Sequence, residues 1–158
     1  MVPAEGGETE FASTRVAWDD LPDDLRRRVE GRVAWHSLQA SRAKVDPTVL
    51  TEEQKAEVPP VRQALVRTNP VNGRKALFIG AHAFRIEGMP DEEAQALLEE
   101  LVAFATRPEC VYAHPWREHD LIVWDNRCLL HRATPFDATR HRRLMQRTTV
   151  AGDAPTVA

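Results

Sequence analysis

Apolar positions recur with a helical period in one long segment, and this segment is the clearest element that the sequence predicts. Pro90 and three acidic residues open it, and Pro108 follows its end. Between them, apolar residues recur every three or four positions, at Ala94, Leu97, Leu98, Leu101, Val102 and Ala105. This spacing is typical of an amphipathic helix with acids in its first turn and a proline beyond its last. We expect this helix to cover one face of a sheet.

The first forty residues combine a strand signal with helix signals. The stretch GGETEFA, from residue 6, reads as a turn that feeds a short strand, and Ser13 is suited to cap a helix running through Trp18. Residues 21–24, Leu-Pro-Asp-Asp, then begin a second helix with a proline at its start and acids in its first turn. Because Leu25, Val29, Val33 and His36 follow at helical spacing, we expect this helix to continue to residue 36.

The remainder of the chain reads mainly as strands separated by turns. Residues 39–60 are polar, contain three prolines and an acidic segment, and predict a loop or flap of the kind that often serves as a lid. Two strands flank Asn72-Gly73, which is a strong hairpin signal. Further strands are expected at 110–116, 120–126 and 143–152. The sequence therefore predicts one domain, residues 1–158, of mixed α/β class with a β-dominated core. Its helical part spans about residues 13–60 and its β core about residues 61–151.

Composition narrows the class of protein and of partner. The 158 residues are long enough for one hydrophobic core, and no apolar run is long enough to cross a bilayer. The net charge of −3 disfavours nucleic acid as a partner. The start of the chain lacks the basic and apolar regions of a signal peptide, so we expect a cytoplasmic location. Cys110 and Cys128 show no metal-binding spacing and are read as core thiols, and the four tryptophans as core anchors.

Candidate chemistry is concentrated near the C-terminal end. On a strand over RLMQRTT, Arg143 and Arg147 share one face, because side chains alternate along a strand. Two guanidinium groups on an inner face need anionic partners, and no acid lies near them in the sequence. A small carboxylate ligand would meet that need, since the arginine fork matches a carboxylate. His131 upstream is either a metal ligand or a structural hydrogen-bonding residue.

These motifs together carry a family resemblance. WDNRCLLHRATPFD followed by RRLMQRT, with GGETEF near the start and GRKALFIGAHAFRIEGM in the middle, resembles the Fe(II)/2-oxoglutarate-dependent dioxygenases of the taurine and 2,4-dichlorophenoxyacetate dioxygenase family. The likeness covers almost the whole chain and is nearer to the aryloxyalkanoate branch. It implies a partial double-stranded β-helix, or jelly roll, with helical inserts, corresponding to the C-terminal portion of a family member. It also implies an enzyme that hydroxylates a small anionic substrate with O₂ while 2-oxoglutarate is decarboxylated to succinate.

The resemblance also implies roles for particular residues. His131 would be an iron ligand. Arg143, helped by Thr9, would grip the far carboxylate of 2-oxoglutarate. Arg147 would face a cosubstrate or substrate anion, and His82 would line the substrate pocket.

One part of the family pattern is not found. Family members hold iron with two histidines and one carboxylate, and two of these ligands come from an HxD motif upstream of GGxT. None of the six histidines here is followed two residues later by an acid. Three hypotheses follow: a truncated dioxygenase, a chain whose site is completed by a partner or a second copy, or a catalytically inactive domain that binds carboxylates or associates with other proteins.

Overall fold

The computed structural model describes residues 1–158 except 4, 45–50, 52–53, 55–57 and 153–158. Its strands and helices, in chain order, are β1 (Thr9–Ser13), α1 (Thr14–Asp19), α2 (Asp23–Val29), β2 (Val33–His36), α3 (Leu38–Ala43), β3 (Val61–Ala64), β4 (Val66–Thr68), β5 (Lys75–Leu77), β6 (Ala83–Ile86), α5 (Asp91–Ala105), a 3₁₀ turn (Pro108–Cys110), β7 (Val111–His114) and β8 (Leu129–Ala133). None of the helices in these ranges is long and apolar enough to span a membrane. The chain is thus rich in short strands with a few helices, as the sequence predicted at this coarse level.

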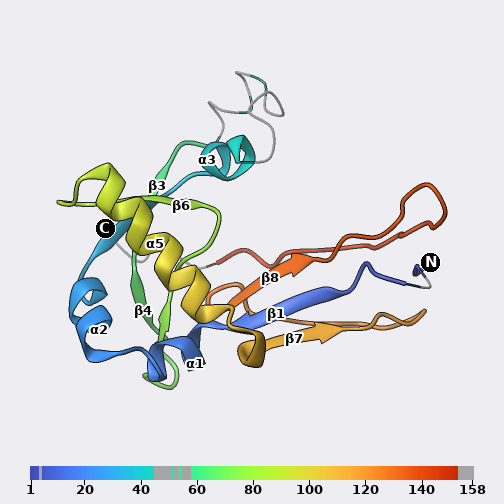
Figure 1. Cartoon of the computed structure of the whole chain (residues 1–158), viewed down its shortest axis with the longest axis horizontal. Helices are drawn as coiled ribbons and strands as arrows, with labels where there is room; N and C mark the ends of the chain where they lie inside the picture. The colour runs from blue at the N-terminus through green and yellow to red at the C-terminus, as the bar shows by residue number, and fades with distance from the viewer. Residues whose placement is uncertain (4, 45–50, 52–53, 55–57, 153–158) are drawn as a thin grey trace.

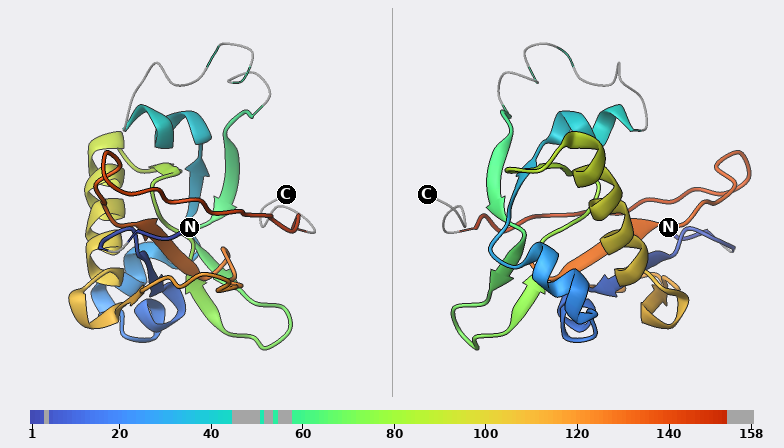
Figure 2. Two further views of the ribbon diagram at one scale, coloured as in Figure 1. Left: turned by 90° about the vertical axis from the view of Figure 1, so that its right-hand side faces the viewer. Right: turned by 60° about the vertical axis from the view of Figure 1, so that its left-hand side comes forward.

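The strands form three small antiparallel sheets. One has the order β7-β1-β8, the second β3-β2-β6, and the third pairs β4 with β5. In Figure 1 the β7-β1-β8 sheet extends to one side of the molecule, while the other strands lie with the helices. In the right-hand view of Figure 2 the segment that follows β8 projects from the body. The N-terminal strand β1 is therefore the central strand of the extended sheet.

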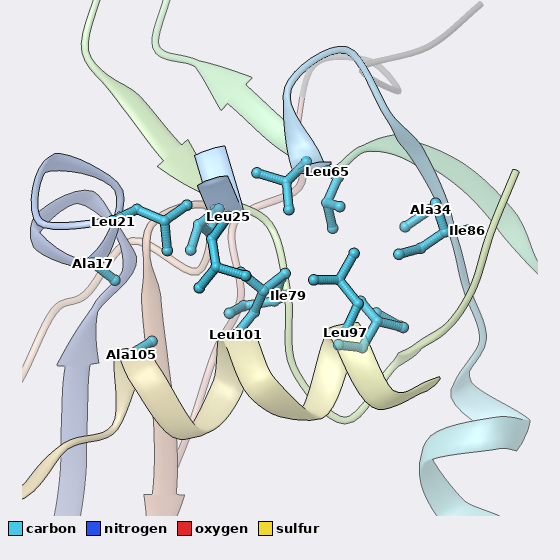
Figure 3. Packing of buried hydrophobic residues seen from close by; sticks show 14 of the residues in the cluster. Ala17, Leu21, Leu25, Ala34, Leu65, Ile79, Ile86, Leu97, Leu101 and Ala105 are labelled. Atoms are coloured by element: carbon cyan, nitrogen blue, oxygen red, sulfur yellow. The ribbon is translucent and has the colours of Figure 1, made fainter. Parts of the chain in front are cut away.

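The hydrophobic core lies between α5 and the β3-β2-β6 and β4-β5 sheets. Leu97 and Leu101 of α5 are fully buried and belong to the same cluster as Leu65, Leu77 and Ile86. Figure 3 shows these α5 side chains directed toward Leu65 and Ile79. Helix α5 packs against β6, and α1 packs against β5. The predicted amphipathic helix is confirmed, and its apolar side does cover strands.

The predicted helix from residue 22 to residue 36 is wrong in its second half. Helix α2 ends at Val29, and Gly31 has a φ of +73°, which interrupts a right-handed helix. Residues Val33–His36 form β2 and pair on both sides, with β3 and with β6. The prediction was wrong because Val33 and His36 continue the helical spacing of Leu25 and Val29 although they belong to a strand that begins after Gly31.

Residues 61–77 form the predicted hairpin, but its first strand is divided. Leu65, fully buried, separates β3 from β4. Strand β3 pairs with β2, and β4 pairs with β5 across a turn that contains Gly73 at a φ of +70°. The predicted flap at 39–60 contains α3, and much of the rest of it lies outside the described residues.

Two predicted strands are absent and one unpredicted strand is present. Residues 120–126 and 143–152 form no strand in the structure, whereas Leu129–Ala133 forms β8 along β1. Leu121 and Val123 are 88% and 87% exposed, while Ile122 and Trp124 are half-buried. Residues 120–126 therefore have the alternation of a strand without a hydrogen-bonded neighbour in the described part of the chain.

Candidate functional site

The best-defined polar arrangement joins Arg143 to the start of β1. Nε of Arg143 donates a hydrogen bond to the carbonyl of Gly7 at 2.9 Å, and its Nη2 donates to Oγ1 of Thr9 at 3.3 Å. Nε1 of Trp116 donates to the same Thr9 oxygen at 2.9 Å, and Thr9 is 7% exposed. The structure therefore brings together Thr9 and Arg143, residues separated by most of the chain.

This arrangement depends on local backbone geometry at two glycines. Gly6 and Gly7 have φ values of +71° and +72°, a region that other residues rarely adopt. A Cβ atom at Gly7 would lie 2.8 Å from Cγ of Pro3 and 3.2 Å from Cδ of Arg143. The absence of a side chain at Gly7 thus allows the Arg143 side chain to lie against the backbone that precedes β1.

Thr9 and Arg143 retain the capacity to bind an anion. Oγ1 of Thr9 accepts two N–H groups, so its own hydroxyl proton is available to a further acceptor. No carboxylate forms an ion pair with Arg143 among the residues that the structure describes. A half-buried guanidinium without a carboxylate, beside a free hydroxyl donor, is suited to receive one.

His131 lies on β8 in a partly apolar setting. It is opposite Phe11 of β1, and its ring centroid is 5.1 Å from that of Trp124 and 6.4 Å from that of Phe11. Although His131 as a whole residue is exposed, partial desolvation lowers its pKa, and the charges of Arg147 and His82 lower it further. A neutral imidazole is the form that binds a metal. Arg147 and His82 thus each lie within electrostatic reach of His131.

The residues present do not by themselves form an iron site. Across the described ranges, no group of three histidine, cysteine, aspartate or glutamate side chains is placed to hold a metal ion. Facial coordination by protein needs three such ligands, and His131 is the one that the sequence predicted. Within the described residues, the structure therefore brings Thr9 and Arg143 into contact but does not place three metal-binding side chains together.

An apolar groove lies beside this site. Its volume is about 590 Å³, and its lining includes Phe11, Tyr112, Leu121, Val123 and Trp124. Phe11 and Trp124 contact each other edge to face, with ring centroids 5.4 Å apart, and both lie near His131. The groove therefore adjoins the predicted metal ligand on the same side of the β7-β1-β8 sheet.

Sequence reasoning missed the part that tryptophans play here. Trp116 was read as a core anchor, but it donates to Thr9, and Trp124 lies against His131. Trp18 does belong to the hydrophobic core. The available signal was chemical, because an indole N–H that is removed from water needs an acceptor. Only the fold could show that the acceptor of Trp116 is Thr9.

Comparison with known proteins identifies the family of this chain. The family model for the taurine catabolism dioxygenase TauD, TfdA family matches residues 1–149. The chain belongs to the TauD/TfdA family. The resemblance drawn from the sequence motifs is thereby confirmed, and this family uses Fe(II) and 2-oxoglutarate.

Individual TauD/TfdA relatives are similar over almost the whole chain. The alpha-ketoglutarate-dependent 2,4-dichlorophenoxyacetate dioxygenase of Burkholderia sp. (strain RASC) is 46% identical over 150 residues, which are 95% of this chain and 50% of that protein. The (S)-phenoxypropionate/alpha-ketoglutarate-dioxygenase of Sphingobium herbicidovorans is 41% identical over 159 residues, 97% of this chain and 55% of that protein. The chain spans about half the length of these curated relatives.

A solved structure supports the same assignment. The crystal structure of AAD-2 in complex with Mn(II) and N-oxalylglycine superposes with a TM-score of 0.92 and 45% sequence identity, and covers 100% of this chain and 62% of that one. The β-rich fold of this chain, with its few helices, is therefore that of the TauD/TfdA-type dioxygenases.

Proposed function

We propose that this chain forms the cosubstrate-binding part of an Fe(II)- and 2-oxoglutarate-dependent dioxygenase that acts on a small anionic substrate. The observation that carries the proposal is the contact of Arg143 with Gly7 and Thr9 in a chain of this family. The two relatives described above are dioxygenases named for 2,4-dichlorophenoxyacetate and (S)-phenoxypropionate, which are anions. We further propose that the β7-β1-β8 sheet is part of a double-stranded β-helix.

Thr9 and Arg143 would bind the far carboxylate of 2-oxoglutarate. The guanidinium of Arg143 offers N–H donors beyond the two it uses toward Gly7 and Thr9, and the Thr9 hydroxyl offers its proton. Charge-assisted hydrogen bonds of this kind are the strongest that a protein can offer to a carboxylate. Trp116 would hold the Thr9 oxygen in place through its own N–H, so that the hydroxyl proton faces the ligand.

The remaining predicted residues would complete the surroundings of the cosubstrate. His131 would supply one metal ligand, and Arg147, within electrostatic reach of it, would attract the anionic end of the cosubstrate or the substrate. His82 would line the substrate side. The described residues do not supply the other two metal ligands.

The proposal is tested by measuring 2-oxoglutarate binding calorimetrically to the chain and to the variant Arg143→Gln. Because hydrogen bonds to charged groups contribute about 1.5–3 kcal/mol each, we expect the variant to bind about 10- to 100-fold more weakly. Arg142→Gln is the matched control, since the neighbouring Arg142 is exposed. We expect it to bind as the unmodified chain does. Equal affinities of the Arg143 variant and the unmodified chain would remove Arg143 from the site.

A second candidate function follows from the lack of a three-ligand metal cluster in the described ranges. In that case the chain is a catalytically inactive domain that binds carboxylates or associates with another protein. An anaerobic titration with Fe(II) and 2-oxoglutarate tests whether the metal site is completed. The visible charge-transfer band of the iron–2-oxoglutarate chelate supports the dioxygenase and excludes the inactive domain. Binding of 2-oxoglutarate without that band shows that the isolated chain binds the cosubstrate but does not hold iron.

A further inference from the structure

A second polar cluster lies on a different part of the fold, where β2, β4 and the end of β5 meet. Its centre is the ring of Phe78, which directly follows β5. The imidazole of His36, from β2, stacks on Phe78 with ring centroids 4.9 Å apart and an interplanar angle of 25°. The guanidinium of Arg67, from β4, lies over the same ring with Cζ 4.5 Å from the centroid. Side chains from two other segments, His36 and Arg67, therefore meet at the ring of Phe78.

Arg67 has no anionic partner within the described ranges. It is half-buried, and desolvation lowers its pKa, as does the nearby charge of Arg127. Asp125 raises the pKa of Arg67. The Asp125 carboxylate, however, already accepts hydrogen bonds from Nε of Arg127 at 2.9 Å and from Nη2 of Arg127 at 3.0 Å. A guanidinium that lies over a ring keeps its N–H donors in its own plane. Arg67 is therefore a partly desolvated cation whose donors remain available to an anion.

His36 has a buried nitrogen that lacks a partner. The residue is 9% exposed, and its Nε2 is buried without a hydrogen bond to any described residue. Burial, with the charges of His82 and Arg67, lowers the pKa of His36 to about 4, whereas a hydrogen bond to the backbone of Phe78 acts in the opposite direction. The ring is therefore neutral at pH 7. Because its other nitrogen faces a backbone acceptor, Nε2 carries the lone pair and accepts a hydrogen bond.

We propose that Arg67 and His36 form a binding site for a small carboxylate that carries a hydroxyl or amide N–H next to the carboxylate group. Arg67 receives the carboxylate, and Nε2 of His36 accepts the neighbouring O–H or N–H. An anion that lacks such a donor would leave the buried nitrogen unpaired, which costs free energy.

The assignment of this site to the substrate rests on the proposed function, and it adds a substrate class to that function. His82 lies within electrostatic reach of both His36 and the predicted metal ligand His131. The backbone N–H of Ser37, next to His36, also donates to the carbonyl of His82 at 2.9 Å. The cluster is thus next to His82, which also lies within electrostatic reach of the proposed metal ligand His131. It would bind the anionic end of a hydroxy- or amido-carboxylate substrate, apart from Thr9 and Arg143.

The test compares two probes that differ by one hydroxyl group. Lactate and propionate are titrated separately into the ¹⁵N-labelled chain, and amide shifts of residues 65–68 and 77–80 are followed by NMR. We expect lactate to bind about fivefold more tightly, the contribution of one neutral hydrogen bond. His36→Phe keeps a stacking ring but removes the acceptor, so the two affinities should become equal. Arg67→Met should weaken both probes at least tenfold.

Control variants distinguish this site from non-specific attraction of anions to arginine and from the site at Thr9. Arg74→Met changes an arginine of the same hairpin that is paired with Asp19, and it should leave both affinities unchanged. Arg143→Met should reduce 2-oxoglutarate binding but leave lactate binding intact, which separates the two sites. Equal affinities of the two probes for the unmodified chain, or loss of lactate binding in Arg143→Met, would overturn the inference. If lactate binds as expected while 2-oxoglutarate does not bind, the site stands and the proposed function fails.

Discussion

Thr9 is the residue on which the candidate carboxylate site depends most. Its hydroxyl oxygen accepts from both Trp116 and Arg143, so a change that removes it leaves two donors unpaired. We expect Thr9→Val, which nearly preserves shape, to destabilise the fold by about 1–3 kcal/mol and to weaken 2-oxoglutarate binding about tenfold. Thr9→Ser keeps the hydroxyl and should behave nearly as the unmodified chain. Calorimetry and urea unfolding measure the two effects, and equal behaviour of the Val and Ser variants would contradict the proposed role.

His36 makes the free energy of unfolding depend on pH. In the unfolded chain a histidine has a pKa of about 6.5, whereas burial lowers the pKa of His36 to about 4 in the folded chain. Between these values the unfolded chain binds more protons, so His36 destabilises the fold as pH falls from 6.5 toward 4 and contributes nothing above that range. We expect His36→Phe to lose less stability than the unmodified chain between pH 7 and pH 5, measured by urea unfolding. His141→Gln serves as the comparison variant for the removal of a histidine elsewhere in the chain. If His36→Phe and the unmodified chain lose the same stability, His36 does not titrate in this way.

The loop before β1 is as important to the site as the side chains that it places. In Gly7→Ala the new Cβ meets Pro3 and Arg143, and the φ of +72° is also unfavourable. We expect this variant to displace Arg143 and to weaken 2-oxoglutarate binding at least tenfold. Gly73→Ala is the matched control, since its φ is +70° and nothing lies within 4 Å of the added Cβ. Both variants should lose similar backbone stability in thermal unfolding, but the control should keep its affinity for 2-oxoglutarate. Loss of affinity in both would mean that global destabilisation, and not the displacement of Arg143, is responsible.

Some elements could be predicted because their signals are local, and others could not because their signals are long-range. Helix α5 follows from its apolar period, and α1 from the capping residue Ser13, whose side chain does accept from the N–H of Val16. Strand β8 has no clear alternation in its sequence and is defined by its pairing with β1, more than a hundred residues away. Residues 120–126 have the alternation but no neighbour that pairs with them among the described segments. Pairing, and not pattern alone, decides which extended segments become strands.

The candidate site shows the same division. Physical reasoning from the sequence predicted that Arg143 and Arg147 need an anionic partner, and the resemblance to the family added Thr9. The structure places Thr9 against Arg143, whereas Arg147 is exposed and the predicted strand that would align it with Arg143 is not formed. Neither route pointed to Trp116 or to the His36, Phe78 and Arg67 cluster, because those contacts join segments that are far apart in the sequence.

The apolar groove on the β7-β1-β8 sheet bears on how the whole molecule behaves in solution. Leu121 and Val123 are almost fully exposed there, and Tyr112 beside them is 59% exposed. Among the described strands, β7 and β8 each pair on one side only, with β1. Exposed apolar surface and unpaired strand edges both favour association with another chain. We therefore expect concentration-dependent self-association through this face.

Sedimentation velocity over a range of concentrations tests this expectation. In the double variant Leu121→Lys, Val123→Lys, two charges occupy the groove, so we expect its weight-average mass to stay near that of one chain, 17.9 kDa, where the unmodified chain forms larger species. Val71→Lys is the control, because Val71 is 92% exposed on the β4–β5 turn and does not line the groove. It should associate as the unmodified chain does. An unmodified chain that remains monomeric at all concentrations contradicts the prediction, and a double variant that still associates would locate the interface elsewhere, with the open edges of β7 and β8 as the next surfaces to alter.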